Sequence, residues 1–512
     1  MARNSLGREI PATWRGHALA PYLDPWSRQP GMLRATRPLV RCHPGESKLL
    51  PSLRAAIERS GLRDGMNIST HHALRNGDLL LNLLVKELDA MGLRDIGIAS
   101  SSVHAVNAEI IPFIRKGVIT RIETGVNGLI GELVSKGELD CPIVVRSHGG
   151  RARSLATGEV EVDAAFLAAP CCDVTGNLNG VYGPSACGSL GYAHTDARYA
   201  KKVIAVTDNL VRFPASPISI SQSEVDYVVQ IESLGDPGKI VSTTTRLARD
   251  PAALLIAKYA SEVIEASGLL KDGFSFQTGS GGTSLAVADL VHRKMAAGKI
   301  KGSFGCGGIT GYFVEMLEQG YFETLLDVQC FDLKAVESLR RNPGHREISA
   351  SLYANPFNRG EVVNMLDCVI LGATEVDVDF NVNVNTESSG YLLHNTGGHS
   401  DTAAGAKLAI VVAPSMRGRL PIVREEVTTV TTPGETVDVI VTERGICVAD
   451  KHEDLKKELL RRKLPLKDIR QFRREITQMT GEPRPVEFED KVVALIEYRD
   501  GSIIDVVRKV RE

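Results

Sequence analysis

The chain carries the stretch Thr278-Gly279-Ser280-Gly281-Gly282-Thr283-Ser284 between an apolar run, Gly273–Gln277, and an amphipathic segment, Leu285–Met295. The run indicates a buried strand and the segment indicates a helix, so the stretch is a glycine-rich loop between them. Roughly 205 residues earlier, Met66–Thr70 leads into a His/Gly loop and then into another amphipathic helix. The chain therefore contains this strand–loop–helix unit twice.

The same offset recurs in other elements. Three pairs share it: Ile98–Ser100 with Gly302–Phe304, Ile122–Thr124 with Leu326–Val328, and Lys202–Thr207 with Leu408–Ala413. A constant offset of this size predicts an α/β protein with two similar open α/β domains in tandem. Loops that leave the strands of both domains are expected to face a cleft between them, where such folds bind ligands.

The predicted boundaries follow changes in pattern. Residues 1–45 are rich in Pro and Arg, lack periodicity and contain Trp14 and Trp26, so we expect a mobile or partner-docking arm. Residues 46–249 form the first predicted domain. Residues 250–512 form the second, which includes charged C-terminal helices and a final β-hairpin as a small extension. Within it, the alternation of Val or Phe with Asp or Asn over 376–384 predicts one strand with a wet face.

The composition limits the class of protein. Apolar residues make up 43% and charged residues 24%, and the formal net charge is −2. That balance argues against nucleic-acid binding, and the chain lacks a long apolar run for a membrane span. An odd number of cysteines, 9, none in CxxC spacing, favours a reduced, cytoplasmic protein. No HExxH-like spacing is present, so no metal site is predicted.

Several loops contain residues suited to chemistry. Glycines such as Gly279, Gly281 and Gly282 allow close backbone approach, and N–H groups at a helix start stabilise an oxyanion. The alternative is a tight strand–helix turn without function; the loop lacks the Lys of a P-loop. The candidate substrate-binding residues gather cationic and polar groups near such loops, which suggests a carboxylate-bearing substrate: His71, His72, Arg75, His148, Arg151, Gly397, Gly398, His399 and Asp401.

The chain resembles the alpha subunit of citrate lyase, the citrate CoA-transferase, from about residue 45 to its end. The matching stretches include Ser69–Ala73 with Arg75, Arg146–Arg151, Cys187–Ala193, Gln277–Gly279, Leu326–Gln329, Gly397–Ala403 and Arg417–Arg419. It is also similar to the wider group of tandem α/β CoA-transferases and acetyl-CoA hydrolases. The shared turns are Pro170 with Asp173 and Gly176, and Thr442 with Glu443 and Gly445.

The resemblance implies exchange of an acetyl thioester for a citryl thioester, with release of acetate. Many relatives form a thioester on a glutamate, and Asp327 stands at the corresponding place here, which makes it a candidate catalytic residue. The citrate lyase branch implies a ternary complex without a covalent enzyme intermediate. The glycine loop is then the oxyanion site, and Arg75, His148, Arg151, His399 and Arg417 are candidates for holding citrate.

The resemblance also implies partners and a compartment. It implies no permanently bound cofactor, because the acyl thioester belongs to CoA or to a dephospho-CoA-type group on a carrier subunit. It implies a cytoplasmic hetero-oligomer with a beta (lyase) and a gamma (acyl-carrier) subunit, without nucleic acid or membrane. Three alternatives stay open: an acetyl-CoA hydrolase, another carboxylate CoA-transferase such as one for citramalate, and a non-catalytic CoA-ester sensor.

Overall fold

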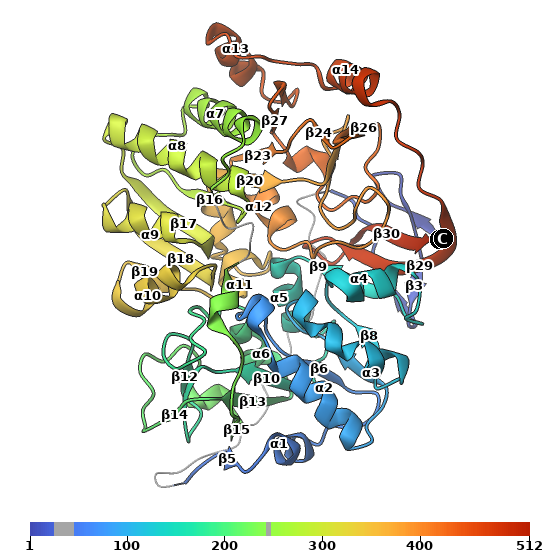
Figure 1. Cartoon of the computed structure of the whole chain (residues 1–512), viewed down its shortest axis with the longest axis vertical. Helices are drawn as coiled ribbons and strands as arrows, with labels where there is room; N and C mark the ends of the chain where they lie inside the picture. The colour runs from blue at the N-terminus through green and yellow to red at the C-terminus, as the bar shows by residue number, and fades with distance from the viewer. Residues whose placement is uncertain (25–45, 242–246, 512) are drawn as a thin grey trace.

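The computed structural model describes residues 1–24, 46–241 and 247–511. Two α/β halves are stacked along the long axis of the molecule, with the first half below the second in Figure 1. Each half is built around one mostly parallel sheet with helices on its faces, as the tandem repeat predicts. The prediction of an α/β fold with two similar open sheets is therefore confirmed.

The first sheet has the strand order β5-β15-β13-β10-β6-β7-β8, and all its neighbours are parallel. Its strands are short and apolar because both faces are covered. In that order they span Leu49–Leu50, Tyr227–Gln230, Lys202–Thr207, Ala164–Ala168, Asn67–Ser69, Ile96–Ile98 and Ile119–Ile122. The helices of this half are α1 (Leu53–Ser60), α2 (Leu80–Ala90), α3 (Ile111–Arg115), α4 (Gly128–Ser135), α5 (His148–Thr157) and α6 (Ala193–Tyr199).

The second sheet has the order β19-β18-β17-β16-β20-β23-β27-β28, parallel except for β28. In that order its strands span His345–Glu347, Phe322–Cys330, Gly302–Ile309, Phe276–Thr278, Cys368–Gly372, Leu408–Val412, Val439–Thr442 and Gly445–Val448. Its helices are α7 (Pro251–Ala266), α8 (Gly282–Gly298), α9 (Gly311–Glu318), α10 (Leu333–Arg341), α11 (Ala350–Ala354) and α12 (His399–Gly405). Six consecutive strands correspond about β6 and β16: β15-β13-β10-β6-β7-β8 of the first sheet match β27-β23-β20-β16-β17-β18 of the second. The repeat in the sequence is therefore a repeat in topology over these six strands, and the two sheets differ at their edges.

Each half also carries a small three-stranded sheet. The first consists of β11 (Cys171–Asp173), β12 (Leu178–Asn179) and β14 (Leu210–Val211), and the second of β21 (Glu375–Asp377), β22 (Val382–Asn383) and β26 (Val423–Arg424). β24 (Met416–Arg417) and β25 (Leu420–Pro421) form a separate hairpin.

The prediction of one half-wet strand over 376–384 was wrong. The segment turns back as the antiparallel pair β21 and β22. The Asp377 carboxylate accepts hydrogen bonds from the backbone N–H groups of Asp379 and Asn381, and Phe380 takes a positive φ of 67°. The polar residues stabilise a buried turn, which local alternation does not distinguish from a wet strand face.

The C-terminal elements join the two halves. After α13 (Glu453–Arg461) and α14 (Ile469–Thr480), the hairpin of β29 (Phe488–Glu497) and β30 (Ile503–Val510) forms as predicted. β29 then pairs in parallel with β9 (Ile143–Arg146) of the first half. Figure 1 shows this hairpin beside α4, between the halves. The strand pairing thus crosses the predicted boundary at residue 249.

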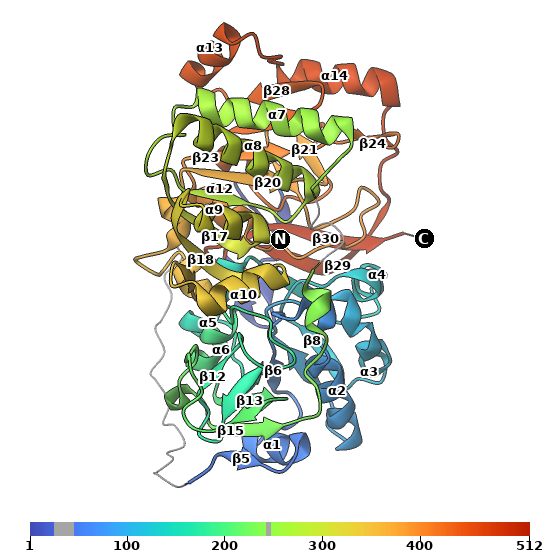
Figure 2. The same cartoon turned by 60° about the vertical axis from the view of Figure 1, so that its left-hand side comes forward.

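The first 24 residues pack on the same hairpin. Short strands β1 (Ala2–Arg3), β2 (Glu9–Ile10), β3 (Thr13–Trp14) and β4 (His17–Ala18) precede a bridge from Pro21 to Ile503. Ile10 and Tyr22 are fully buried, and Figure 2 marks the N-terminus beside the hairpin. The prediction of a mobile arm is therefore corrected for residues 1–24. Residues 25–45, with Trp26, lie outside the described residues.

Among the helices in the described ranges, none has the length and apolar character needed to cross a bilayer.

Candidate active site

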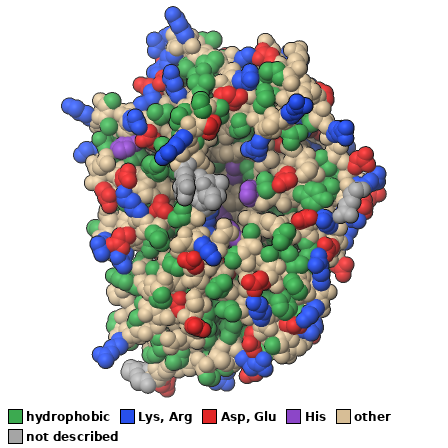
Figure 3. Space-filling view, in the orientation of Figure 1, with side chains coloured by type: hydrophobic (Ala, Val, Ile, Leu, Met, Phe, Trp, Pro, Cys, Tyr) green, Lys and Arg blue, Asp and Glu red, His purple; other side chains and the backbone are tan. Residues whose placement is uncertain are grey.

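The carboxyl ends of the two sheets face each other. The Gln329 side-chain amide, near the end of β18, donates a 2.8 Å hydrogen bond to the backbone carbonyl of His72, just after β6. The backbone N–H of His148 donates to the carbonyl of Gly397, also at 2.8 Å. Figure 3 shows a hollow between the halves with histidine side chains inside it. The predicted cleft is therefore present.

Four aromatic rings lie together at this junction. The Tyr192 ring stacks on His72 with a centroid distance of 4.4 Å and lies 4.5 Å from the His148 ring. His72 also lies 5.2 Å from His104 and 5.7 Å from His148. The four residues come from four separate segments: His72 and His104 lie in the loops after β6 and β7, His148 begins α5 after β9, and Tyr192 precedes α6. We call His72, His104, His148 and Tyr192 the ring cluster.

The imidazoles of the ring cluster are uncharged at neutral pH. Burial, with the charge of Arg151 and the neighbouring His104, lowers the pKa of His148 to about 3. Burial, followed by the charge of Arg75, lowers the pKa of His104 to about 3. Burial also holds the pKa of His72 well below its usual range. Neutral imidazoles offer one N–H donor and one acceptor each, which suits orientation of a carboxylate or hydroxyl.

Arg75 brings positive charge to this cluster. Its guanidinium lies 4.7 Å from the centroid of the Phe331 ring and donates to the Ile240 carbonyl at 3.2 Å. Burial lowers its pKa, although the ordinary value for arginine is so high that the group stays charged. Its backbone has a positive φ of 51°, a strained conformation for a residue other than glycine. A fixed, half-buried guanidinium beside neutral imidazoles is suited to hold an anion.

The glycine loop lies at the start of α8, as predicted. Gly281 occupies the N-cap position without a side-chain cap, and its φ of −72° is open to any residue. A Cβ atom added at Gly281 would meet no heavy atom within 4 Å. Neither backbone conformation nor packing therefore requires glycine there. The open space and the uncapped N–H groups are what approach of a ligand carbonyl would need.

Two side chains connect the strand before the loop to the Gly397-Gly398 turn, whose Gly397 carbonyl accepts from the His148 N–H at 2.8 Å. The Gln277 amide donates to the Tyr353 hydroxyl at 2.8 Å. The Tyr353 hydroxyl in turn would lie 2.5 Å from a Cβ atom at Gly398, next to Gly397. The predicted residues Gly279, Gly397, Gly398 and His148 are thus brought to one region.

Four predicted binding residues have partners inside the protein. The Arg151 guanidinium binds the buried Asp196 carboxylate at 2.7 Å, and His71 Nε2 contacts the Ala168 carbonyl at 3.0 Å. Both ring nitrogens of His399 are engaged, by Thr432 Oγ1 at 2.7 Å and by the Gly372 carbonyl at 2.8 Å. Asp401 accepts hydrogen bonds from Ser147 and Gly149. These contacts support the cleft walls. Unlike the ring nitrogens of His399, His71 Nδ1 and Arg151 Nε have no hydrogen-bond partner among the described residues. The substrate-binding roles of His71, Arg151, His399 and Asp401 stay predictions.

Asp327 does not reach the cleft. Its side chain is fully buried, and one carboxylate oxygen is bonded to His345 Nε2 at 3.0 Å and to Cys330 Sγ at 2.9 Å. Burial raises its pKa, against the effect of His345. Burial and these contacts favour a structural role, and the catalytic role of Asp327 stays a prediction. Arg417 is exposed on the β24–β25 hairpin and donates to the Ala373 carbonyl at 3.4 Å, beyond the end of β20.

Sequence reasoning missed His104, Tyr192 and Gln329 as site residues. His104 follows the polar run Ser100–Ser102 at the end of β7, and that position at a strand end was a usable signal. Tyr192 and Gln329 lie inside quoted family stretches, but nothing in their local pattern separates a cleft residue from a buried one.

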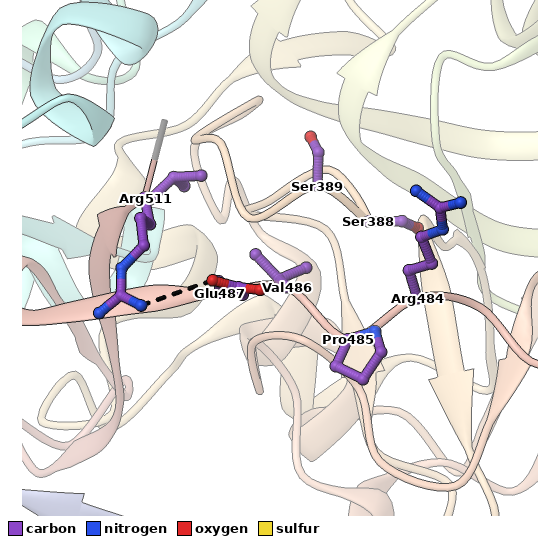
Figure 4. Close-up of a pocket in the computed structure, with 8 residues that line it drawn as sticks. Ser388, Ser389, Arg484, Pro485, Val486, Glu487 and Arg511 are labelled. Carbon is purple, nitrogen blue, oxygen red and sulfur yellow. Dashed lines mark hydrogen bonds and ion pairs between the residues drawn. The ribbon is translucent and has the colours of Figure 1, made fainter.

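The structure also contains pockets away from the cleft. One, of about 460 Å³, lies between residues 388–389 and the chain around 484–487 and 510–511. Figure 4 shows Arg484 and Arg511 at opposite ends of it, with Arg511 paired to Glu487 at 3.5 Å. It contains none of the predicted site residues. Among the described residues, no group of three or more His, Cys, Asp or Glu side chains is arranged for a metal ion.

Comparison with solved structures defines the class. A malonate decarboxylase alpha subunit from Acinetobacter baumannii matches with a TM-score of 0.63 at 15% identity, over 84% of this chain and 89% of that one. The citrate-bound putative alpha subunit of citrate lyase from Streptococcus mutans matches with a TM-score of 0.95 at 45% identity, over 100% of both chains. The stacked halves and facing strand ends thus belong to a tandem α/β fold of the CoA-transferase type.

Comparison of sequences gives the family. The family described as citrate lyase, alpha subunit (CitF), matches residues 46–510. The citrate lyase alpha chain of Klebsiella pneumoniae is 47% identical over 97% of this chain and 96% of its own length, and that of Escherichia coli is 46% identical over 91% and 92%. The chain belongs to the citrate lyase alpha-subunit family. Because that subunit is the citrate CoA-transferase of the enzyme, transferase activity is assigned to the chain.

Proposed function

We propose that the cleft exchanges the acetyl group of an acetyl thioester for citrate, within a ternary complex and without a covalent enzyme intermediate. The observation that supports this most directly is the ring cluster with Arg75 on one side of the cleft and the open, uncapped glycine loop on the other. The fully buried Asp327, enclosed by His345 and Cys330, favours a route in which no enzyme carboxylate takes up the acyl group.

The proposed reaction has two steps. A citrate carboxylate attacks the thioester carbonyl, which gives an acetyl–citryl anhydride and a free thiolate. The thiolate then attacks the citryl carbonyl, and acetate leaves with the electron pair of the broken anhydride bond. A carboxylate is already nucleophilic at neutral pH, so the chemistry requires no general base.

The cleft residues are assigned to two kinds of negative charge, the oxyanion of the intermediates and the carboxylates of citrate. Both tetrahedral intermediates carry an oxyanion, and we assign its stabilisation to the backbone N–H groups at Gly281 and Gly282. The Gly279 N–H, also a predicted donor, instead donates to the Ile370 carbonyl at 3.1 Å. The citrate carboxylates are assigned to Arg75 and to the three imidazoles of the ring cluster, His72, His104 and His148. Arg75 supplies positive charge, and hydrogen bonds from the neutral imidazoles orient the carboxylates. Arg417, exposed on the β24–β25 hairpin, stays a candidate for holding a citrate carboxylate.

We propose the partners on the family relationship. The donor is acetyl-CoA or an acetyl group on the dephospho-CoA-type arm of a gamma (carrier) subunit, and a beta subunit cleaves the citryl thioester. The assembly is expected to be a cytoplasmic hetero-oligomer. The open hollow in Figure 3 suits access by a long flexible arm.

One assay tests the reaction. The protein is incubated with acetyl-CoA, with and without citrate, and the products are separated by chromatography. Citryl-CoA and acetate that appear only with citrate support transfer. Acetate that appears equally without citrate indicates hydrolysis, and no product indicates a binding protein. Citramalate in place of citrate measures the selectivity for the acceptor.

A further inference from the structure

The turn between β29 and β30 inserts one arginine between the halves. Arg499 is buried, and its Nη2 atom donates to the Ala354 carbonyl at 3.1 Å and to the Glu361 carboxylate at 2.5 Å. Its Nε atom lies 3.6 Å from Oδ1 of Asp401 and has no hydrogen-bond partner of its own. The C-terminal turn thus places a positive charge beside a buried carboxylate of the second half.

Asp401 holds the residues on both sides of His148. Its Oδ1 atom accepts from the Ser147 hydroxyl at 2.8 Å, and its Oδ2 atom accepts from the Gly149 N–H at 2.9 Å. His148 lies between them at the first position of α5, and its ring packs in the ring cluster. Movement of the Asp401 carboxylate would therefore move the start of α5 and the His148 ring with it.

The turn is also fixed from its other side. The Tyr498 ring meets the fully buried Tyr22 ring edge-on at 5.0 Å. The Asp500 carboxylate accepts hydrogen bonds from the backbone N–H of Ser502 at 2.9 Å and from the Ser502 hydroxyl at 2.6 Å. A Cβ atom at Gly150 would lie 3.4 Å from Cα of Arg499, so α5 packs directly on the turn. The position of Arg499 relative to α5 is therefore set by packing on both sides.

We propose that Arg499 is a positioning residue for the cleft: it holds Asp401, and through Asp401 it holds His148 in the ring cluster. The proposal deepens the proposed function, because it rests on the assignment of His148 to substrate. It gives the C-terminal hairpin a part in the site although the hairpin contributes no residue to the ring cluster.

Electrostatics supports this chain of contacts. The charged and titratable groups that act on Asp401 or respond to its charge are Arg499, Glu361, Tyr192, Tyr353 and Tyr498. Burial raises the pKa of Asp401 to about 6, and Arg499 acts against that rise. Removal of Arg499 is expected to raise the pKa of Asp401 further, which favours its protonated form. A protonated Asp401 is a weaker acceptor for the Ser147 and Gly149 contacts.

The test compares Arg499→Met with Arg499→Lys, which keeps the charge, and with Arg153→Met as a matched control. Arg153 is also buried, lies on α5, the helix that begins at His148, and pairs with Glu497 of the hairpin that carries Arg499. Among the contacts of the described residues, no hydrogen bond or ion pair joins Arg153 to Asp401. Arg499→Met is expected to lower kcat about 100-fold, as misplaced catalytic groups do, and to move the acidic limb of the kcat–pH profile to higher pH. Arg499→Lys should restore most of kcat and return the acidic limb of the kcat–pH profile to its wild-type position. Arg153→Met should lower the unfolding temperature and leave the limb in place.

A second readout does not depend on activity. The rate at which diethylpyrocarbonate modifies His148, measured by mass spectrometry against the exposed His17, is expected to change several-fold in Arg499→Met and to return in Arg499→Lys. Asp401→Asn should reproduce the change even if Arg499→Met fails to fold. Unchanged His148 reactivity and an unchanged limb in these variants would overturn the proposal. Altered reactivity in a protein whose wild type shows no citrate-dependent transfer would instead contradict only the proposed function.

Discussion

At the scale of single residues, the chain shows how little an arginine's sequence context says about its role. Arg75 and Arg151 both follow His/Gly loops, and both were predicted to bind substrate. Arg151 meets Asp196, far along the chain, and is neutralised in the core. Arg75 meets the face of Phe331 and keeps its charge beside the ring cluster. The difference lies in long-range partners, which no local pattern contains.

The glycine loop gives the first prediction. Gly281→Val is expected to fold normally, because the φ and ψ of Gly281 suit valine and the space around it is open. It should lower kcat about 100-fold or more by blocking the oxyanion position, the usual effect of removing such donors. Gly360→Val, where a Cβ would meet nothing closer than 3.8 Å, is the matched control. Near-normal turnover in soluble Gly281→Val would remove the loop from the mechanism.

Asp327 gives the second prediction. Asp327→Ala is expected to lower the free energy of unfolding by about 3 kcal/mol, because it strands His345 in the core. His345→Ala should cost a similar amount, since it breaks the same contact. Both are measured by denaturant unfolding. Borohydride treatment after incubation with acetyl-CoA should leave the wild-type activity intact. Loss of activity together with a mass change at Asp327 would restore the covalent route.

At the scale of elements, the apolar strands, the glycine loop and the C-terminal hairpin could be predicted, because each depends on a local repeat. The partner of an edge strand could not. Nothing around Val492–Ile496 indicates that β29 pairs with β9, some 350 residues earlier. The hairpin over 376–384 was not predicted for a related reason. Its turn depends on hydrogen bonds from two backbone N–H groups to Asp377, and the alternation of residue types does not indicate these bonds. The ring cluster likewise required the topology before its members could be grouped.

The N-terminal segment gives the third prediction. A free arm would allow deletion without effect on transfer from acetyl-CoA, but residues 1–24 pack on the hairpin. Asn4 donates to the carbonyls of Ile503 and Ile504, and Ile10 and Tyr22 are fully buried. Each large apolar side chain exposed costs about 2 kcal/mol.

Deletion of residues 1–24 is therefore expected to lower both the unfolding temperature and transfer from free acetyl-CoA. Tyr22→Phe, which keeps the ring that contacts Tyr498, should retain both. Full activity and unchanged unfolding in the deletion would show that the packed segment does not support the site.

At the scale of the whole molecule, the two halves share one site and one strand ladder. Within the described residues, β9 belongs to the sheet β30-β29-β9 and pairs with β29 alone. Arg146 of β9 binds Glu497 of β29 at 3.0 Å, and Leu392 N–H donates to the Ser135 hydroxyl of α4 at 2.8 Å. The boundary at residue 249, which follows the repeat, therefore separates similar units that we do not expect to fold independently.

The fourth prediction tests this dependence by producing residues 1–249 and 250–512 as separate chains. Each chain alone exposes an apolar interface and leaves β9 or β29 without its partner strand. We therefore expect aggregation or a broad, uncooperative unfolding transition. Produced together, the chains should co-purify and recover citrate-dependent transfer, because β9–β29 pairing and the contacts across the cleft reform without the connection. The control is the full chain cut between residues 249 and 250 after folding, which should keep its activity. If residues 250–512 alone give a soluble chain with a sharp, reversible unfolding transition, the hairpin is stable without β9, and the sequence-derived boundary marks two independent domains after all.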